Sequence, residues 1–274
     1  TDRSRGLGDV YKRQQYMRNS KWQYLLASVV SSILAMGCKE QSVIIVPCLL
    51  LFDWMLFKRN MRSLKVYIEK VYYLIPAIAI FIVTLVANKN TGEEIIGYTI
   101  VDRFIFLCYS SFKYLLISAI PFKLSYLYPF PFQVGEKIPM ALWIYPFVIL
   151  FIGYVIYLNR RKPLLVFCTL FFILHLLPVL HVIPLPRYVV AADRYLYIPY
   201  IAFAIGLSIL SYHLYERQRK WILYAGFLYC SYLCVYTAGY APAWKNSDTL
   251  KEHFKEVLKK RETNLSINFK HEKQ

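Results

Sequence analysis

Long apolar runs, repeatedly interrupted by clusters of lysine and arginine, constrain this sequence more than any other feature. Hydrophobic side chains make up 58% of the 274 residues. A helix of about 17 to 25 apolar residues can cross the hydrocarbon core of a bilayer. A sheet with open edges cannot, because its backbone polar groups would stay unpaired. The sequence therefore predicts an all-α, polytopic bundle of transmembrane helices in a multi-pass integral membrane protein.

The basic clusters orient these runs. The formal net charge is +17, and cytoplasmic loops are enriched in Lys and Arg, so the charge needs no nucleic acid to explain it. If every basic loop is cytoplasmic, the number of crossings between two successive basic loops must be even, and this gives about seven spans. The run 104–121, which contains Lys113, is then left over and is predicted to be a re-entrant or interfacial helix. A true span with one basic loop on the wrong side is the alternative. The expected spans are residues 22–37, 42–57, 71–87, 141–158, 164–180, 196–212 and 221–238.

The start of the chain does not read as part of the fold. Residues 1–14 resemble a translated sequencing adapter, and we exclude them from the structural interpretation. Residues 15–240 then form the predicted transmembrane domain, and we expect an authentic N-terminal part of that domain to be missing. In its present form the chain is therefore interpreted as a fragment.

The pattern changes to an amphipathic one in residues 241–274. A helix is expected over 248–260, with apolar side chains on one face and charges on the other. Thr249 and Glu252 have the spacing of a capping box. A helix of this length cannot bury its apolar stripe alone, so we expect it to begin a soluble helical domain on the non-cytoplasmic side.

The cysteines and histidines do not indicate a metal or redox centre. Five of the six cysteines lie inside apolar runs without CxxC spacing, which is typical of small buried residues. His175 and His181 have no acid at helical spacing, so we interpret them as core or interface histidines. No metal or other cofactor is expected. Asp53, near the end of an apolar run, is expected to pair with a nearby lysine.

Four polar segments fall on the same face of the membrane in this topology, although only the basic loops were used to derive it. That face is the non-cytoplasmic one, where positive charge is normally disfavoured. We therefore interpret the convergence of these segments on one face as evidence that they carry function. They are residues 39–40, 125–132, 187–194 and 244–248.

Three cations in these segments are candidate phosphate ligands. Lys39 offers a compact point charge, whereas Arg187 and Arg194 have planar guanidinium groups that match phosphate geometry. Lys39 lies beside Glu40, so a self-paired hairpin tip is an equally good interpretation of that turn.

The other polar side chains of these segments have two interpretations each. Asp193 is most simply the partner that fixes Arg194, and contact with substrate is the alternative. Tyr126 and Tyr195 are either aromatic residues of the membrane interface or contacts to a ligand.

Four segments resemble a known family when taken together and in order. The resemblance is to the GT-C superfamily of polytopic glycosyltransferases, and within it to the transmembrane-and-TPR O-mannosyltransferases and their bacterial relatives. The similar segments are CKEQSVIIVP at 38–47, PFKLSYLYPF at 121–130, ADRYLYIP at 192–199 and WKNSDTL at 244–250.

The resemblance implies transfer of a sugar, such as mannose, from a polyprenyl-phosphate carrier to an acceptor hydroxyl on a protein or glycan. The membrane would be the bacterial inner membrane or that of the endoplasmic reticulum. Such chemistry needs cations for the departing phosphate, which Lys39, Arg187 and Arg194 would supply. It also needs a catalytic carboxylate, which the family carries in an earlier loop, so this fragment is predicted to be inactive.

The remaining polar residues receive supporting roles in this interpretation. Glu40, Asp193, Tyr195 and Tyr126 would orient substrate or the carrier site, and no divalent metal is indicated. The family also carries tetratricopeptide repeats after the membrane domain, but the tail helix lacks their consensus.

Two other classes of function stay open. A transporter or flippase for a lipid-linked or anionic solute needs polar residues at mid-membrane depth, and the mid-span positions here are apolar. A non-catalytic membrane scaffold would use the aromatic and charged segments only to pack against a partner.

Overall fold

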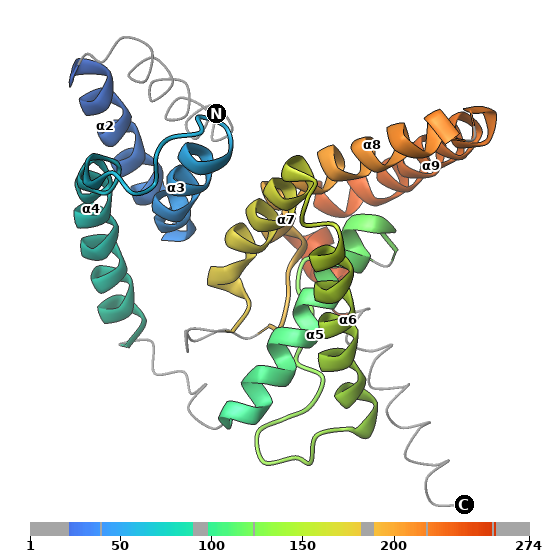
Figure 1. Ribbon diagram of the computed structural model, residues 1–274. Helices are drawn as coiled ribbons and strands as arrows, with labels where there is room; N and C mark the ends of the chain where they lie inside the picture. Colours follow the sequence, from blue (N-terminus) through green and yellow to red (C-terminus); the bar gives the residue numbers. More distant parts are fainter. Residues whose placement is uncertain are drawn as a thin grey trace, which may run out of the picture. The chain divides into compact units, whose positions relative to one another are not determined.

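The structure is a computed structural model that describes residues 22–38, 40–89, 98–122, 124–181, 189–217, 219–253 and 255. Regular structure in these ranges is helical, apart from one isolated antiparallel bridge, which confirms the all-α prediction for them (Figure 1). The elements are α2 (Trp22–Cys38), η1 (Glu40–Ile44), α3 (Ile45–Met55), α4 (Leu64–Lys89), α5 (Ile100–Ala119), η2 (Met140–Trp143), α6 (Ile144–Leu158), α7 (Pro163–Leu176), η3 (Leu177–Val179), η4 (Asp193–Leu196), α8 (Pro199–Arg217), α9 (Arg219–Tyr240) and η5 (Ala241–Trp244).

Within the described residues, three helical stretches are long and apolar enough to cross a membrane: Leu64–Thr84, Met140–Leu158 and Trp221–Trp244. Shorter apolar helices cover Trp22–Cys38, Ser42–Met55 and Pro163–Val179. The chain thus has helices suited to a bilayer, as predicted. Seven spans, and a helix α5 that does not cross, stay predictions.

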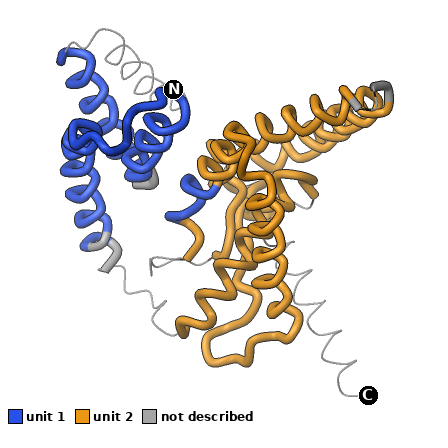
Figure 2. Tube along the Cα trace, viewed as in Figure 1, with its two compact units in different colours: residues 1–95, 173–178, 184–186 blue, residues 96–172, 179–183, 187–274 orange. Residues whose placement is uncertain are grey.

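The chain divides into two compact units (Figure 2). Unit 1 comprises residues 1–95, 173–178 and 184–186. Unit 2 comprises residues 96–172, 179–183 and 187–274. Helices α2, α3 and α4 belong to unit 1, whereas α5, α6, α8 and α9 belong to unit 2. Each unit is described by itself below.

The core of unit 1 forms where α2 and α4 pack together. Small residues on α2 allow this close approach, because Ser28 and Ser32 are fully buried. The hydroxyl of Tyr73 donates a hydrogen bond of 3.0 Å to Oγ of Ser28, which links the two helices. The apolar cluster around it consists of Met36, Val46, Leu49, Tyr73 and Ala77.

Helix α4 begins at Leu64, earlier than the start at residue 71 that the apolar pattern predicts. Glu69 and Lys70 therefore lie inside the helix and are buried, although Lys70 was expected to be a basic loop residue. That expectation was wrong because charged residues near the start of a helix resemble a loop in sequence when their partners lie outside that helix.

Helix α5 of unit 2 starts with a capping box. The backbone N–H of Asp102 donates to Oγ1 of Thr99 at 3.2 Å, and the backbone N–H of Thr99 donates to Oδ2 of Asp102 at 2.7 Å. Helices α5 and α6 lie side by side (Figure 1). The ring of Tyr145 on α6 contacts those of Tyr109 and Phe112 on α5, with centroids 5.1 and 5.5 Å apart.

Helix α9 provides a row of tyrosines that bind backbone groups at the C-terminus of α5 and just beyond it. We call Tyr229, Tyr232 and Tyr236 the tyrosine ladder. Backbone that leaves a helix needs such partners wherever water is scarce. The bonds run from Tyr229 Oη to Ala119 O at 2.8 Å, from Tyr232 Oη to Pro121 O at 2.6 Å, and from Leu124 N to Tyr236 Oη at 2.9 Å.

The tail helix begins one turn earlier than its predicted capping box. The side-chain oxygen of Asn246 accepts hydrogen bonds from the backbone N–H groups of Asp248 at 3.1 Å and Thr249 at 2.8 Å. Oγ1 of Thr249 accepts from the backbone N–H of Asn246 at 3.3 Å, which closes the reciprocal pair. The predicted pairing of Thr249 with Glu252 was therefore wrong, because Asn246 is the better N-cap residue. Residues 256–260 of the expected helix lie outside the described part.

Candidate functional site

The predicted site residues divide into those that the structure describes and those that it does not. Lys39 and Arg187 lie outside the described residues, and the side chain of Glu40, at the start of η1, also lies outside them. The other four predicted residues come together in unit 2. We call the group around them the Asp193 cluster, which consists of Lys113, Tyr126, Tyr128, Asp193, Arg194, Tyr195, Tyr240 and Trp244.

Backbone pairing brings the two polar segments of the Asp193 cluster side by side. The backbone N–H of Tyr128 donates to the carbonyl oxygen of Ala191, and the N–H of Val190 donates to that of Tyr128, each at 2.9 Å. The hydroxyl of Tyr114 on α5 accepts from the N–H of Ala192 at 3.2 Å. These bonds place the start of η4, and hence Asp193, next to the ring of Tyr128.

The Asp193 carboxylate is held through one of its two oxygens. The hydroxyl of Tyr128 donates to Oδ1 at 2.9 Å and itself accepts from the backbone N–H of Ser125 at 3.0 Å. Oδ2 is buried and accepts no hydrogen bond of ordinary geometry from the described residues. Burial raises the pKa of Asp193 from 3.8 to about 6, although the Tyr128 bond and the Lys113 charge lower it. The carboxyl group therefore titrates within reach of neutral pH.

Arg194 does not pair with Asp193, so the simplest interpretation of that dipeptide was wrong. The bridge between Tyr128 and Ala191 turns the carboxylate toward Tyr128. The guanidinium lies over the rings of Tyr126 and Tyr195, 5.0 and 5.2 Å from their centroids. It donates to the hydroxyl of Tyr195 at 3.3 Å. Among the described residues, no carboxylate lies within ion-pair distance of it.

Lys113 is a member of the cluster that the sequence interpretation missed. Its ammonium group lies 4.9 Å from the centroid of the Tyr128 ring, and its charge acts on Asp193. The side chain is half-buried and pairs with no carboxylate of the described residues. The sequence does contain a signal for this residue, namely a single lysine inside an apolar run. Such a lysine must face either protein or water, which makes it a candidate site residue.

Aromatic residues from the end of α9 complete the cluster. The Trp244 ring meets Tyr126 edge to face with centroids 5.8 Å apart and lies 6.4 Å from Tyr240. Tyr240 also contacts His253 of the tail helix at 5.6 Å. The structure thus brings together parts of three of the four polar segments, namely 125–132, 189–194 and 244–248.

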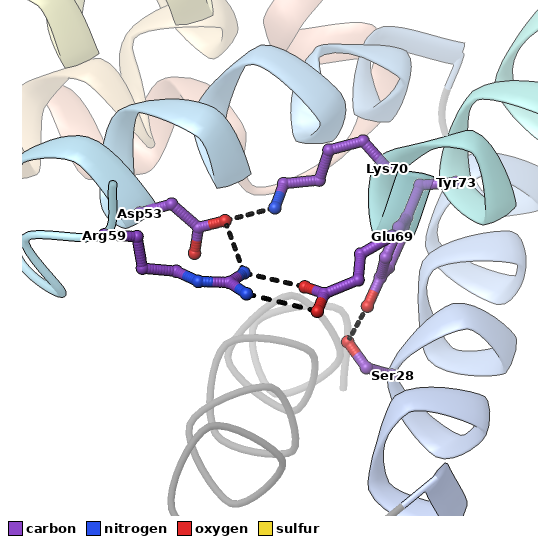
Figure 3. A network of polar contacts seen from close by, with 6 residues as sticks. All are labelled: Ser28, Asp53, Arg59, Glu69, Lys70 and Tyr73. Atoms are coloured by element: carbon purple, nitrogen blue, oxygen red, sulfur yellow. Dashed lines mark hydrogen bonds and ion pairs between the residues drawn. The ribbon is translucent and has the colours of Figure 1, made fainter. Parts of the chain in front are cut away.

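A second polar group lies in unit 1, between the end of α3 and the start of α4 (Figure 3). Arg59 donates to both oxygens of Glu69 at 2.7 and 3.1 Å and approaches Asp53 Oδ2 at 3.4 Å. Lys70 also donates to Asp53, which confirms the expected pairing of that aspartate with a lysine. The bond to Glu69 raises the pKa of Arg59. We call these four residues the ion network.

His175 and His181, the two histidines interpreted from the sequence, each contact a group of their own unit. Nε2 of His181 lies 3.1 Å from the carbonyl oxygen of Val190, so this histidine has a polar partner, and its interpretation as a core or interface histidine stays a prediction. Both ring nitrogens of His175 lie 3.8 Å from the sulfur of Cys48 in unit 1. Across the described residues, no group of three or more His, Cys, Asp or Glu side chains is placed to hold a metal ion.

Comparison with known proteins adds no relative: no family model, no curated protein and no solved structure matches this chain. The resemblance to membrane glycosyltransferases therefore depends on the four sequence segments alone, and the activity that it implies stays a prediction.

Proposed function

We propose that this chain is part of a membrane glycosyltransferase that transfers a sugar from a polyprenyl-phosphate carrier to an acceptor hydroxyl on the non-cytoplasmic face. The observation that carries the proposal is the state of Arg194, a half-buried guanidinium without a carboxylate partner among the described residues. A desolvated cation without a counter-ion is costly, and a phosphate diester or monoester would supply the missing charge.

Different residues of the Asp193 cluster would have different roles in this reaction. Arg194 and Lys113 would hold the carrier phosphate and stabilise the charge that develops on it as the sugar leaves. Tyr126 and Tyr195 keep the guanidinium plane in place through their ring faces. Asp193, fixed by Tyr128, would orient substrate.

Three further predicted ligands have side chains outside the described residues. Lys39 and Arg187 are proposed as phosphate ligands, and Glu40 as an orienting group.

A transporter is the alternative that one observation favours. Glu69 and Lys70 are ionisable residues buried in α4, inside the candidate span Leu64–Thr84, and such residues often mark a transport pathway. They lie near the start of the helix and are paired within the ion network, whereas transporter sites lie near the midplane. We therefore favour the transferase.

The experiment that tests the proposal measures sugar transfer by the complete protein from a polyprenyl-phosphate-linked donor. Arg194→Ala is expected to lower the rate by at least about tenfold, because it removes charge-assisted bonds to the phosphate. Arg160→Ala is the matched control, since Arg160 also lies over a tyrosine ring, 4.0 Å from that of Tyr157, but outside the cluster. Normal transfer by Arg194→Ala, at an unchanged protein level, would refute the proposed role.

A further inference from the structure

Between the end of α3 and the start of α4, the acidic side chains are buried, whereas most of the basic side chains are exposed. Residues 53–70 contain two acids and five bases. Both acids, Asp53 and Glu69, are buried and paired with Arg59 and Lys70 in the ion network, with exposed fractions of 0% and 5% (Figure 3). The other three bases are all exposed and form no ion pair with the described residues. These three, Lys58, Arg62 and Lys65, are called the basic turn.

The backbone of this turn is held in one conformation by local bonds. The N–H of Arg59 donates to the carbonyl oxygen of Asp53 at 2.9 Å, and Lys58 before it has a positive φ of 47°. The side-chain oxygen of Asn60 accepts a hydrogen bond from the backbone N–H of Arg62 at 3.0 Å. The backbone carbonyl oxygen of Asn60 accepts one from the backbone N–H of Ser63 at 3.0 Å. The cations are therefore presented on an ordered scaffold, which lowers the entropic cost of binding an anion.

Exposed apolar side chains flank the three cations. Trp54 is 50% exposed and Leu64, the first residue of α4, is 76% exposed. The apolar stretch that can cross a membrane begins at this same leucine. Cations beside exposed aromatic and aliphatic side chains, at the end of a candidate span, are typical of the headgroup layer of a bilayer.

We propose that the basic turn binds the headgroup phosphates of anionic phospholipids. The two acids that could have neutralised the turn are buried within the ion network, so its outward charge is uncompensated. Each Lys or Arg near an anionic surface contributes about a fivefold gain in affinity, and three together contribute roughly 100-fold. This interaction is independent of the proposed transferase activity.

The test measures lipid binding to the purified chain in neutral detergent by native mass spectrometry. The chain is titrated with phosphatidylglycerol, with phosphatidylcholine and with inorganic phosphate. The wild type should bind phosphatidylglycerol in preference to phosphatidylcholine. The variant Lys58→Gln, Arg62→Gln, Lys65→Gln should lose that preference, with an affinity lower by roughly 100-fold.

The matched control neutralises three exposed lysines of the tail, in the variant Lys245→Gln, Lys251→Gln, Lys255→Gln, and should keep the preference. The proposal is overturned if the basic-turn variant binds phosphatidylglycerol like the wild type, or if phosphatidylcholine binds equally well. It is also overturned if inorganic phosphate displaces the lipid at the same concentration, because the site would then serve a free anion.

A single substitution tests whether the ordered backbone of the basic turn contributes to lipid binding in addition to its charge. Asn60→Ala removes the side-chain acceptor for the N–H of Arg62 and leaves every charge in place. The affinity for phosphatidylglycerol should fall severalfold if the ordered turn matters. Unchanged affinity would overturn this part of the proposal. Because Asn60 is exposed, its replacement should leave the packing of unit 1 intact.

Discussion

The hydroxyl of Tyr128 donates a hydrogen bond of 2.9 Å to Oδ1 of Asp193, across 65 positions of the sequence. The same tyrosine pairs through its backbone with Ala191, so the carboxylate is directed away from its neighbour Arg194. The guanidinium then rests on aromatic rings instead. Two opposite charges that adjoin in the chain are thereby separated, and each faces a different set of partners.

Removing that hydroxyl should change the acidity of the carboxyl group. In Tyr128→Phe the pKa of Asp193, which is about 6 in the wild type, should rise because a donor to the charged form is lost. Infrared difference spectroscopy with isotope-labelled aspartate would follow the protonated carboxyl band against pH. Tyr126→Phe is the control, since Tyr126 contacts Arg194, not the carboxylate. An unmoved band in Tyr128→Phe would contradict the assigned bond.

Asp193 should also make stability depend on pH. Its pKa is higher in the folded state, about 6 against 3.8, so the folded state binds more protons between these values. The stabilising contribution is full below pH 3.8 and is lost as the pH rises through about 6. Asp193→Asn should abolish this dependence and be more stable above pH 6, by at most about 3 kcal/mol.

Thermal unfolding in detergent at several pH values measures that effect. The exposed Asp248, changed to Asn, provides the control and should keep the wild-type pH dependence. Parallel curves for the wild type and Asp193→Asn would show that the buried carboxyl is not the titrating group.

The tyrosine ladder should protect the backbone after α5. Tyr236→Phe removes the acceptor of the Leu124 N–H, so hydrogen exchange at that amide should become faster, and stability should fall by about 1 kcal/mol. Hydrogen exchange followed by mass spectrometry of peptides spanning 120–128 measures the change. Tyr224→Phe is the control because Tyr224 is 69% exposed on the same helix. Equal exchange in both variants would contradict the role of the ladder.

The ion network should behave as a unit. Glu69→Gln removes a carboxylate that accepts two bonds from Arg59 and should destabilise the chain by about 3 kcal/mol, because the half-buried guanidinium would lose its main counter-charge. Combining Arg59→Met with Glu69→Leu should recover much of this loss. Thermal unfolding of Arg59→Met, Glu69→Leu and the double variant gives the coupling energy. Additive effects would mean that the two side chains act separately.

The sequence predicted the helical class well and the helix ends less well. Apolar runs and basic loops indicated most of the helices, because hydropathy is a local property. The start of α4 was missed because Glu69 and Lys70 are tolerated inside a packed helix only through Asp53 and Arg59. That pairing is a tertiary contact, which local periodicity does not contain.

The sequence predicted several residues of the candidate site, but it did not predict which side chains contact one another. Tyr126, Asp193, Arg194 and Tyr195 do come together in unit 2. Adjacency suggested an ion pair between Asp193 and Arg194, whereas a backbone bridge formed by residues distant in sequence decides where each side chain points. Lys113 joins the cluster through a tertiary contact as well, since its ammonium group on α5 lies over the ring of Tyr128.

The binding of a short prenyl phosphate to the purified chain tests the central claim most directly, since binding does not require the catalytic base. Calorimetric titration of the wild type, Arg194→Ala, Lys113→Gln and the double variant, with Arg160→Ala as control, would give the affinities. We predict at least about a tenfold loss for Arg194→Ala, a further loss in the double variant and no change in the control. Wild-type affinity in Arg194→Ala would contradict the account of the Asp193 cluster as a phosphate site.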